Sequence, residues 1–246
     1  MSVIIKAENL GKNFGRVKAL DGLNIEINEG ELYGLLGPNG SGKTTLLRIL
    51  VGVLLPTYGK IQILGSEKPF MKSAEIGYMN QSESLYIDLT IRENISFFGS
   101  LYGVEKSLCK KRTEELLVLL EISERADDLV GNLSSGMRKR VSLACALIHN
   151  PRILLLDEPT VGIDPALRLS FWSHFYQLNK KGVTILLSSH QMDEAEKCLR
   201  LGFLREGKLL AEGNPREIKS MAGKETLEES FLHFIKSHQQ AEVLQK

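Results

Sequence analysis

The sequence predicts an α/β fold with a mostly parallel central sheet, an antiparallel side sheet and an inserted α-helical subdomain. Short, continuously apolar runs alternate with segments of helical spacing, which is typical of a parallel sheet covered by helices. A glycine-rich turn separates one such run from the helical segment that follows it. The stretch 83–150 has no clear strand, so we read it as helices inserted between strands of the sheet.

The N-terminal part supplies the side sheet and the first central strand. Residues 3–30 and 58–65 are typical of short strands separated by turns, and we expect them to pair antiparallel. Residues 32–36 form a continuous apolar run, so both faces of that strand are expected to be buried. The spacing of apolar residues over 44–54 predicts a helix directly after the glycine-rich turn.

The C-terminal part continues the alternation of strands and helices. Residues 153–156 and 183–187 are further buried strands, and 165–181 has helical spacing. Residues 203–213 predict a hairpin that turns at Glu206-Gly207. One face of a helical tail carries Leu227, Phe231, Phe234 and Ile235. We expect this face to pack on its own domain; a tail that binds a partner is the alternative.

Composition narrows the classes of function. The chain has 246 residues, 43% apolar and 25% charged, which suits a globular domain with a large core. The net charge of +1 provides no broad attraction for nucleic acid, so no nucleic-acid partner is expected. We expect the basic runs 110–112 and 138–140 to lie on solvated helix faces.

The cysteines and the hydropathy indicate in which cellular compartment the protein is expected to act. Cys109, Cys145 and Cys198 form no Cys-x-x-Cys pair, so neither a disulfide framework nor a zinc site is indicated, and a reducing compartment fits best. The N-terminus lacks the pattern of a signal peptide. No apolar run approaches the ~18 residues that a membrane span needs. If the protein acts at a membrane, we expect another chain to cross it.

The glycine-rich turn fits the phosphate-loop pattern G-x-x-x-x-G-K-[ST]. Its residues are Gly37, Pro38, Asn39, Gly40, Ser41, Gly42, Lys43 and Thr44, followed by Thr45. The glycines allow successive backbone N–H groups to point at phosphate oxygens, and the next helix adds its positive N-terminal end. Lys43 is expected to reach the β- and γ-phosphates, and the Thr44 hydroxyl to coordinate Mg²⁺. The fold is therefore predicted to be a P-loop NTPase core that binds ATP and Mg²⁺.

Polar residues close two later strands of the predicted sheet. Asp157 and Glu158 follow the second buried strand, where ligands of parallel α/β sheets bind. Asp157 is expected to hold Mg²⁺ directly or through its water, and Glu158 to orient the attacking water. His190 directly follows a further apolar strand and is a candidate contact to the γ-phosphate; a structural histidine is the alternative.

Ser134-Ser135-Gly136 precedes a helix that we expect to begin near Arg138. Small residues there leave backbone N–H groups and a hydroxyl at a helix N-terminus, which makes a second anion site. An ordinary capped helix start is the alternative interpretation.

The order of these elements resembles the nucleotide-binding subunit of ABC transporters over nearly the whole chain. That resemblance implies that Gln81 touches Mg²⁺ and the attacking water, and that Asp164 lies in a loop linking two active sites. It also implies that Phe14 stacks on adenine, where the family usually has tyrosine. The implied catalytic residues are Lys43, Gln81, Glu158 and His190; the implied metal ligands are Thr44, Gln81 and Asp157.

The chain departs from the family in its second loop. The common signature is L-S-G-G-Q, whereas here Ser135 replaces a glycine and Met137 replaces the glutamine. Ser135 adds a Cβ and a hydroxyl where backbone approaches phosphate closely. The segments 85–94, 97–103 and 227–232 resemble the branch that energises small separate permeases, which is dominated by exporters.

We therefore expect a single ATPase domain over 1–246. Its nucleotide-binding core would comprise 1–82 and 151–218, with a helical subdomain over 83–150 and a C-terminal helical tail over 219–246. The resemblance implies two chains, identical or paralogous, that close around two ATP molecules at the cytoplasmic face of the membrane and drive a multi-span permease. A non-transport ABC-type ATPase, such as a cell-division or mechanical-force subunit, is the alternative, and a nucleotide sensor without catalysis is a more distant one.

Overall fold

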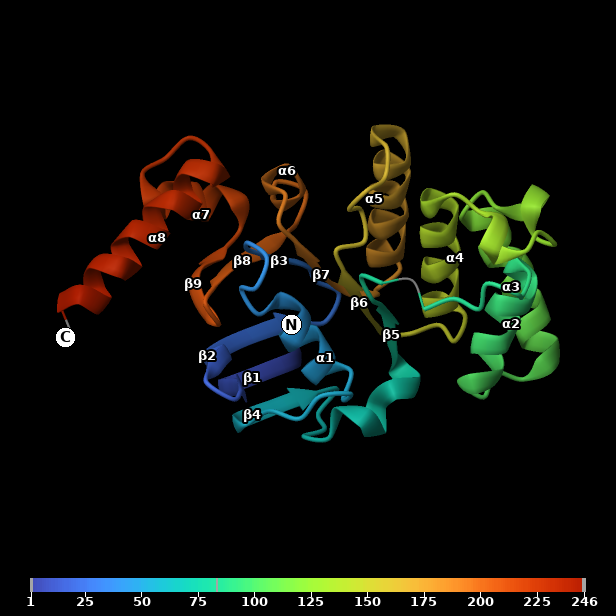
Figure 1. Ribbon diagram of the computed structural model, residues 1–246, viewed down its shortest axis with the longest axis horizontal. Helices are drawn as coiled ribbons and strands as arrows, with labels where there is room; N and C mark the ends of the chain where they lie inside the picture. The colour runs from blue at the N-terminus through green and yellow to red at the C-terminus, as the bar shows by residue number, and fades with distance from the viewer. Residues whose placement is uncertain (1, 83, 245–246) are drawn as a thin grey trace. The chain divides into compact units, whose positions relative to one another are not determined.

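The computed structural model describes residues 2–82 and 84–244 (Figure 1). Residues 1, 83, 245 and 246, which the predicted domain bounds include, lie outside the described residues. The chain divides into two compact units, one formed by Met1–Lys72 with Leu186–Lys246 and the other by Ser73–Ile185.

The first unit contains the antiparallel side sheet. Strand β1 (Val3–Phe14) lies between β2 (Val17–Asn28) and β4 (Tyr58–Ile63) and pairs antiparallel with both (Figure 1). The predicted pairing is confirmed, but the prediction of short strands is wrong, because β1 and β2 each run for 12 residues. Several register shifts interrupt their pairing, and such irregularities break the sequence alternation from which strand length is estimated.

The same unit contains β3 (Leu32–Leu36), β8 (Arg200–Arg205) and β9 (Lys208–Gly213). Strand β3 is wholly buried and pairs parallel with β8, and β8 pairs antiparallel with β9. The predicted hairpin turn is confirmed: Glu206 and Gly207 connect the strands with φ values of 49° and 77°. Gly207 donates to the Ser41 carbonyl (2.9 Å) and accepts from the Asp21 amide (3.0 Å), so this turn braces both the glycine-rich loop and β2.

Helix α1 (Lys43–Leu50) follows β3 and ends four residues before the predicted end, because Gly52 takes a positive φ of 79°. The short helix α6 (Met192–Ala195) and helices α7 (Pro215–Ala222) and α8 (Leu227–Leu244) complete the unit. Tail residues Leu227, Phe231 and Phe234 pack on a core cluster that includes Phe203. Phe203 and Phe231 meet edge to face at 5.0 Å, so the prediction that the tail packs on its own domain is confirmed.

The second unit joins a pair of parallel strands to helices. Strand β5 (Ile76–Met79) pairs with the fully buried β6 (Ile153–Asp157), which leads toward α5 (Pro165–Lys180). Strand β7 (Thr184–Ser189) and the 3₁₀ helix η1 (Pro69–Glu75) cross the boundary between the units. The parallel pairs β3–β8 and β5–β6, together with the side sheet, confirm the predicted α/β class.

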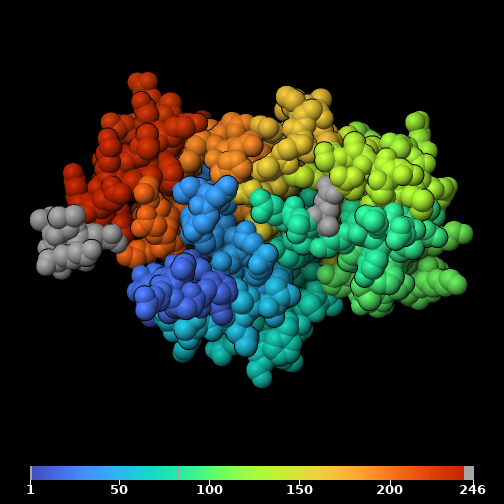
Figure 2. Space-filling model, in the orientation of Figure 1, coloured from blue at the N-terminus to red at the C-terminus, as the bar shows by residue number. Residues whose placement is uncertain are grey.

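Helices α2 (Ile91–Leu101), α3 (Lys106–Leu119) and α4 (Ser135–Leu147) pack against one another, with η2 (Ser123–Arg125) and η3 (Val130–Asn132) between α3 and α4. No named strand lies among the described residues from 84 to 150, which confirms the predicted helical content; the subdomain boundaries stay a prediction. Figure 2 shows this segment in green to yellow-green, exposed along much of its length. Within the described part of the chain, no helix combines the length and apolar character that crossing a bilayer requires.

Candidate functional site

The phosphate loop is shaped by glycines that no other residue replaces easily. A Cβ on Gly37 would lie 2.0 Å from the Leu204 carbonyl oxygen, inside any permitted contact distance. Gly42 caps α1 with a φ of 112°, and a Cβ there would lie 2.4 Å from the carbonyl oxygen of Ala19. The backbone therefore curls between β3 and α1 under steric constraint on both sides. This is the geometry that turns successive N–H groups inward toward an anion.

The polar side chains of the loop suit a phosphate ligand. Lys43 is 4% exposed, and its ammonium donates to the carbonyls of Gly37 (2.7 Å) and Pro38 (3.1 Å). The hydroxyl of Ser41 is buried and has no hydrogen-bond partner among the described residues. A buried hydroxyl without a partner is costly unless a ligand oxygen satisfies it, so the loop fits a triphosphate. Thr44 and Thr45 lie half-buried in the first turn of α1.

His190 lies beside this loop. The carbonyl oxygen of Ser189, the last residue of β7, accepts from the amide of Gly37 (3.2 Å), so the next residue emerges next to the phosphate loop. The side chain of His190 is exposed. Phe14 ends β1 and is 51% exposed, with the ammonium of Lys12 5.2 Å from the ring centroid. An exposed aromatic ring of this kind is available to stack on a flat ligand.

The acidic pair lies in the second unit, at the end of β6. Asp157 is 1% exposed and Glu158 is 5% exposed. Glu158 has a φ of 50°, in the left-handed region that residues other than glycine rarely adopt. Its carboxylate accepts from the side-chain amide of Gln81 at 2.9 Å. The structure thus brings together Gln81 and Glu158, two residues expected to act on the same water, and shows a strained backbone at Glu158 that the sequence did not reveal.

The second loop also lies in this unit and differs from the prediction in one respect. Helix α4 begins at Ser135, three residues before the predicted start near Arg138, because Ser134 caps it and accepts from the Met137 amide (3.3 Å). Ser135 occupies the first helical position and has no positive φ, so its side chain fits without backbone strain. A Cβ on Gly136 would meet only the end of the Leu167 side chain, at 2.6 Å.

This second loop opens onto a cavity of about 530 Å³, which is also lined by Gly162, Ile163 and Asp164. Asp164 is exposed and caps α5, accepting from the Leu167 amide at 2.9 Å. Ser134 and Ser135 are exposed as well. The two loops that the sequence linked to a second copy of the chain thus share one open cavity.

Sequence reasoning missed one buried residue of this unit. The basic run 138–140 was expected on a solvated helix face, but Lys139 is only 8% exposed and donates to backbone carbonyls after β6. The expectation is therefore wrong for Lys139. Helical spacing could have shown it, because Lys139 shares one face of α4 with the buried residues Ser142, Leu143 and Ala146.

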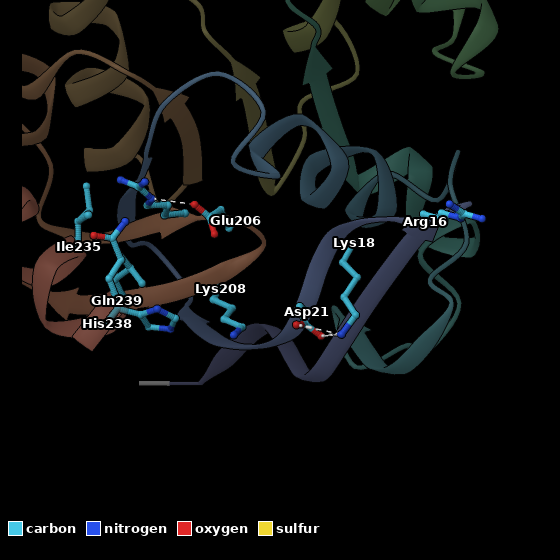
Figure 3. A pocket seen from close by; sticks show the side chains of 10 residues that line it. Arg16, Lys18, Asp21, Glu206, Lys208, Ile235, His238 and Gln239 are labelled. Carbon is cyan, nitrogen blue, oxygen red and sulfur yellow. Dashed lines mark hydrogen bonds and ion pairs between the residues drawn. The ribbon is translucent and has the colours of Figure 1, made fainter. Parts of the chain in front are cut away.

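A different cavity of the first unit, of about 320 Å³, has no predicted site residue in its lining. Figure 3 shows Lys208 between the Lys18–Asp21 ion pair of β2 and residues Ile235, His238 and Gln239 of α8. The carboxylate of Asp21 also accepts from Tyr58 (2.8 Å), and that of Glu206 is paired with Arg205 (3.1 Å). Both acidic groups already have partners within the chain, so this surface presents mainly basic side chains.

Comparison with known proteins points in the same direction as the geometry. Residues 20–161 match the family described as ABC transporter. "Probable multidrug ABC transporter ATP-binding protein YbhF" of Escherichia coli strain K12 is 38% identical over 94% of this chain, which spans only 42% of that protein. "Nod factor export ATP-binding protein I" of Paraburkholderia xenovorans strain LB400 is 40% identical over 86% of this chain and 71% of its own length.

Among solved structures, a dimeric post-hydrolysis state of an ATP-binding cassette bound to ADP and Pi aligns with a TM-score of 0.79. It is 29% identical and covers 85% of this chain and 98% of its own. The likeness in fold therefore spans most of both chains.

Proposed function

The chain belongs to the ABC transporter family, as an ATP-binding and ATP-hydrolysing subunit, and from this premise we propose that it is the motor of an exporter. In this proposal it pairs with a second ATP-binding subunit and drives a multi-span permease from the cytoplasmic face of the membrane. The domain division into a core, a helical subdomain and a tail is part of the same proposal.

The observation that carries the proposal is the environment of Glu158. Its carboxylate is buried, held by the Gln81 amide, and placed directly after the Asp157 carboxylate. A fixed carboxylate at the end of a parallel strand is suited to orient and polarise the water that attacks the γ-phosphate. We assign this role to Glu158, with Gln81 orienting the same water and His190 contacting the γ-phosphate.

The first unit holds the nucleotide. Backbone amides of the phosphate loop, the hydroxyl of Ser41 and the ammonium of Lys43 bind the phosphates, and the ring of Phe14 stacks on adenine. Thr44, Asp157 and Gln81 offer a hydroxyl, a carboxylate and an amide oxygen, the hard ligands that Mg²⁺ prefers. When bound, Mg²⁺ neutralises charge that develops on the phosphate oxygens.

The second loop completes a nucleotide site of another copy. The exposed Ser134 and Ser135, with the half-buried Gly136, present a helix N-terminus to the open cavity that they share with Asp164. A phosphate bound to another chain would satisfy these groups, which is consistent with the dimeric state of the related cassette. ATP then joins the two chains, and its hydrolysis weakens the contact.

The permease is expected to bind the start of the helical segment. Tyr86 is 50% exposed and meets Phe97 edge to face at 4.7 Å, beside Leu85. The buried Asn94 side chain fixes this segment, because it donates to the Tyr86 carbonyl and accepts from the Tyr86 amide, both at 2.9 Å. A rigid, exposed aromatic surface suits an apolar helix of a partner. That relatives are named for multidrug transport and Nod factor export favours export.

Glu158→Gln tests the catalytic assignment. We expect ATP hydrolysis to fall at least ~100-fold, because a general base contributes that much or more. ATP binding should persist, and the variant should form an ATP-dependent dimer that gel filtration with light scattering detects. Glu124→Gln, an exposed change in the same unit, should leave both measurements at wild-type values. Normal hydrolysis by Glu158→Gln, or a variant that stays monomeric with ATP, would refute the proposal.

Tyr86→Asp tests the permease surface. A charge there should abolish ATP-driven transport in membranes while the isolated chain keeps its ATPase, since the exposed Tyr86 ring packs on Phe97 and Phe98, which have no assigned role in hydrolysis. Leu101→Asp, which charges another exposed apolar position on the same helical segment, is the control. Transport at the wild-type rate by Tyr86→Asp would contradict the assignment of the permease surface.

A further inference from the structure

Lys139 is a buried cation that the assigned roles do not use. It lies in α4, is 8% exposed, and its ammonium donates to the carbonyls of Pro159 (3.2 Å), Glu158 (3.4 Å) and Val161. Lysine is rarely buried, and a buried ammonium is tolerated only where polar atoms replace its water. Carbonyls of the turn after β6 provide that replacement here.

The turn that Lys139 holds has an unfavourable backbone. Glu158 takes a φ of 50° without being glycine, and its carbonyl also accepts from the Val161 amide at a long 3.4 Å. A weak turn of this kind persists only when surrounding groups fix it. Lys139 binds the carbonyl of the strained residue itself and those of the next residues, so it fixes the direction in which the Glu158 side chain leaves the backbone.

We propose that Lys139 is a positioning residue that holds Glu158 where its carboxylate meets Gln81 and the attacking water. The inference rests on the proposed catalytic role of Glu158. Helix α4 would then serve two sites. It begins at Ser134-Ser135-Gly136, and Lys139 lies about 6 Å along the helix axis from that start. The helix proposed to meet the nucleotide of another chain is therefore the same helix that positions the carboxylate of this chain.

The test compares Lys139→Met and Lys139→Gln in the full-length chain. Methionine keeps the buried stem but removes every donor, and misplacement of a catalytic group costs rate rather than affinity. We expect kcat for ATP hydrolysis to fall at least ~10-fold in Lys139→Met, with KM for ATP within ~2-fold of wild type. Glutamine retains one amide donor to the carbonyls, so Lys139→Gln should recover kcat to about a third of wild type.

Two controls separate positioning from general damage. Lys110→Met, an exposed change on α3, should leave kcat and KM unchanged. In the Glu158→Gln background, Lys139→Met should form the ATP-dependent dimer at ATP concentrations within ~2-fold of those for Glu158→Gln alone, because the contribution of Lys139 is made through Glu158. If Lys139→Met does not fold, the test rests on Lys139→Gln alone, for which a threefold loss in kcat is expected.

The inference is overturned if folded Lys139→Met, or Lys139→Gln when read alone, has wild-type kcat. It is overturned equally if KM and dimer formation deteriorate together with kcat, which would indicate only a structural role. Full ATPase activity in Glu158→Gln would instead sink the proposed function. A large loss in Glu158→Gln with none in either lysine variant would sink the positioning role alone.

Discussion

The two loops that we propose to bind phosphate are built in different ways. The phosphate loop of the first unit is enclosed by its own chain: backbone carbonyls of Ala19 and Leu204 press on its glycines, and Lys43 is buried within it. The loop at Ser134–Gly136 in the second unit is exposed, capped by one hydroxyl and bordered by an open cavity. One loop is enclosed by its own chain, whereas the other faces a cavity that the chain leaves open. Under the proposed function, nucleotide affinity and assembly with a second chain therefore depend on separate parts of one sequence.

The largest effect on stability and ATP binding is expected for Gly42→Ala, in the enclosed phosphate loop. A Cβ there is strained at a φ of 112° and lies 2.4 Å from the backbone oxygen of Ala19, which cannot rotate away. We expect the free energy of unfolding to fall by about 3 kcal/mol and ATP binding to be lost. Urea unfolding and ATP titration measure the two effects.

Gly40→Ala is the matched control for Gly42→Ala. Gly40 also has a positive φ, of 79°, but nothing lies within 4 Å of the position that a Cβ would take, so only backbone strain of about 1 kcal/mol is expected. Equal losses in both alanine variants would show that crowding by the chain does not shape the loop.

Acid should affect the two units differently, because the second contains a half-buried histidine with a lowered pKa, His149. Burial lowers the pKa of His149 to about 4; its ring stacks on Tyr102 at 3.7 Å and bonds the Ile76 carbonyl. The unfolded chain, with a histidine pKa near 6.5, takes up this proton first as the pH falls. Stability from the neutral ring is therefore complete above pH 6.5 and is lost progressively between pH 6.5 and 4.

His149→Phe isolates this effect while keeping a ring against Tyr102. Between pH 7 and pH 4 the wild-type chain should lose about 2 kcal/mol more of unfolding free energy than the variant, a value discounted for the partial exposure of the ring. Urea unfolding across that pH range measures the difference. Parallel stability curves for the two proteins would contradict the assignment.

The smallest effect on stability is expected for Gly136→Ala, which changes a glycine of the loop at Ser134–Gly136 instead of the phosphate loop. The new Cβ meets only the flexible end of Leu167, and alanine favours the helix, so unfolding free energy should stay within about 1 kcal/mol of wild type. ATP-dependent dimerisation in the Glu158→Gln background should nevertheless weaken, because a methyl group occupies the surface offered to another chain. If Gly136→Ala lowered the free energy of unfolding as much as Gly42→Ala, the two loops would not differ in how tightly their own chain encloses them.

Local patterns predicted the parts of the fold that local forces determine. The phosphate loop, the turn at Glu206-Gly207 and the apolar face of α8 follow from glycine conformation and helical period, and each lies where the sequence placed it. Helix α4 begins three residues before its predicted start, because the Ser134 hydroxyl caps it and Ser135 takes the first helical position.

Tertiary contacts determined what the sequence could not show. Lys139 sits in a run of charges that resembles a solvated face, and only the fold brings carbonyls of residues 158–161 to its ammonium. The positive φ of Glu158 is equally invisible, because glutamate carries no preference for that conformation. In the candidate site, the helical spacing of α4 already places Lys139 on a buried face, whereas the carbonyls that it meets and the positive φ of Glu158 do not follow from the sequence.

The turn at Gly207 gives the C-terminal tail an importance that its position would not suggest. This single residue ties the phosphate loop to β2, and the hairpin that carries it is covered by Phe231 and Phe234 through their contacts with Phe203. A chain shortened before Leu227 would therefore uncover aromatic surface next to the brace of its nucleotide loop. Such a truncation should promote aggregation and loosen nucleotide retention together, so the tail is a poor place to trim this protein for crystallisation.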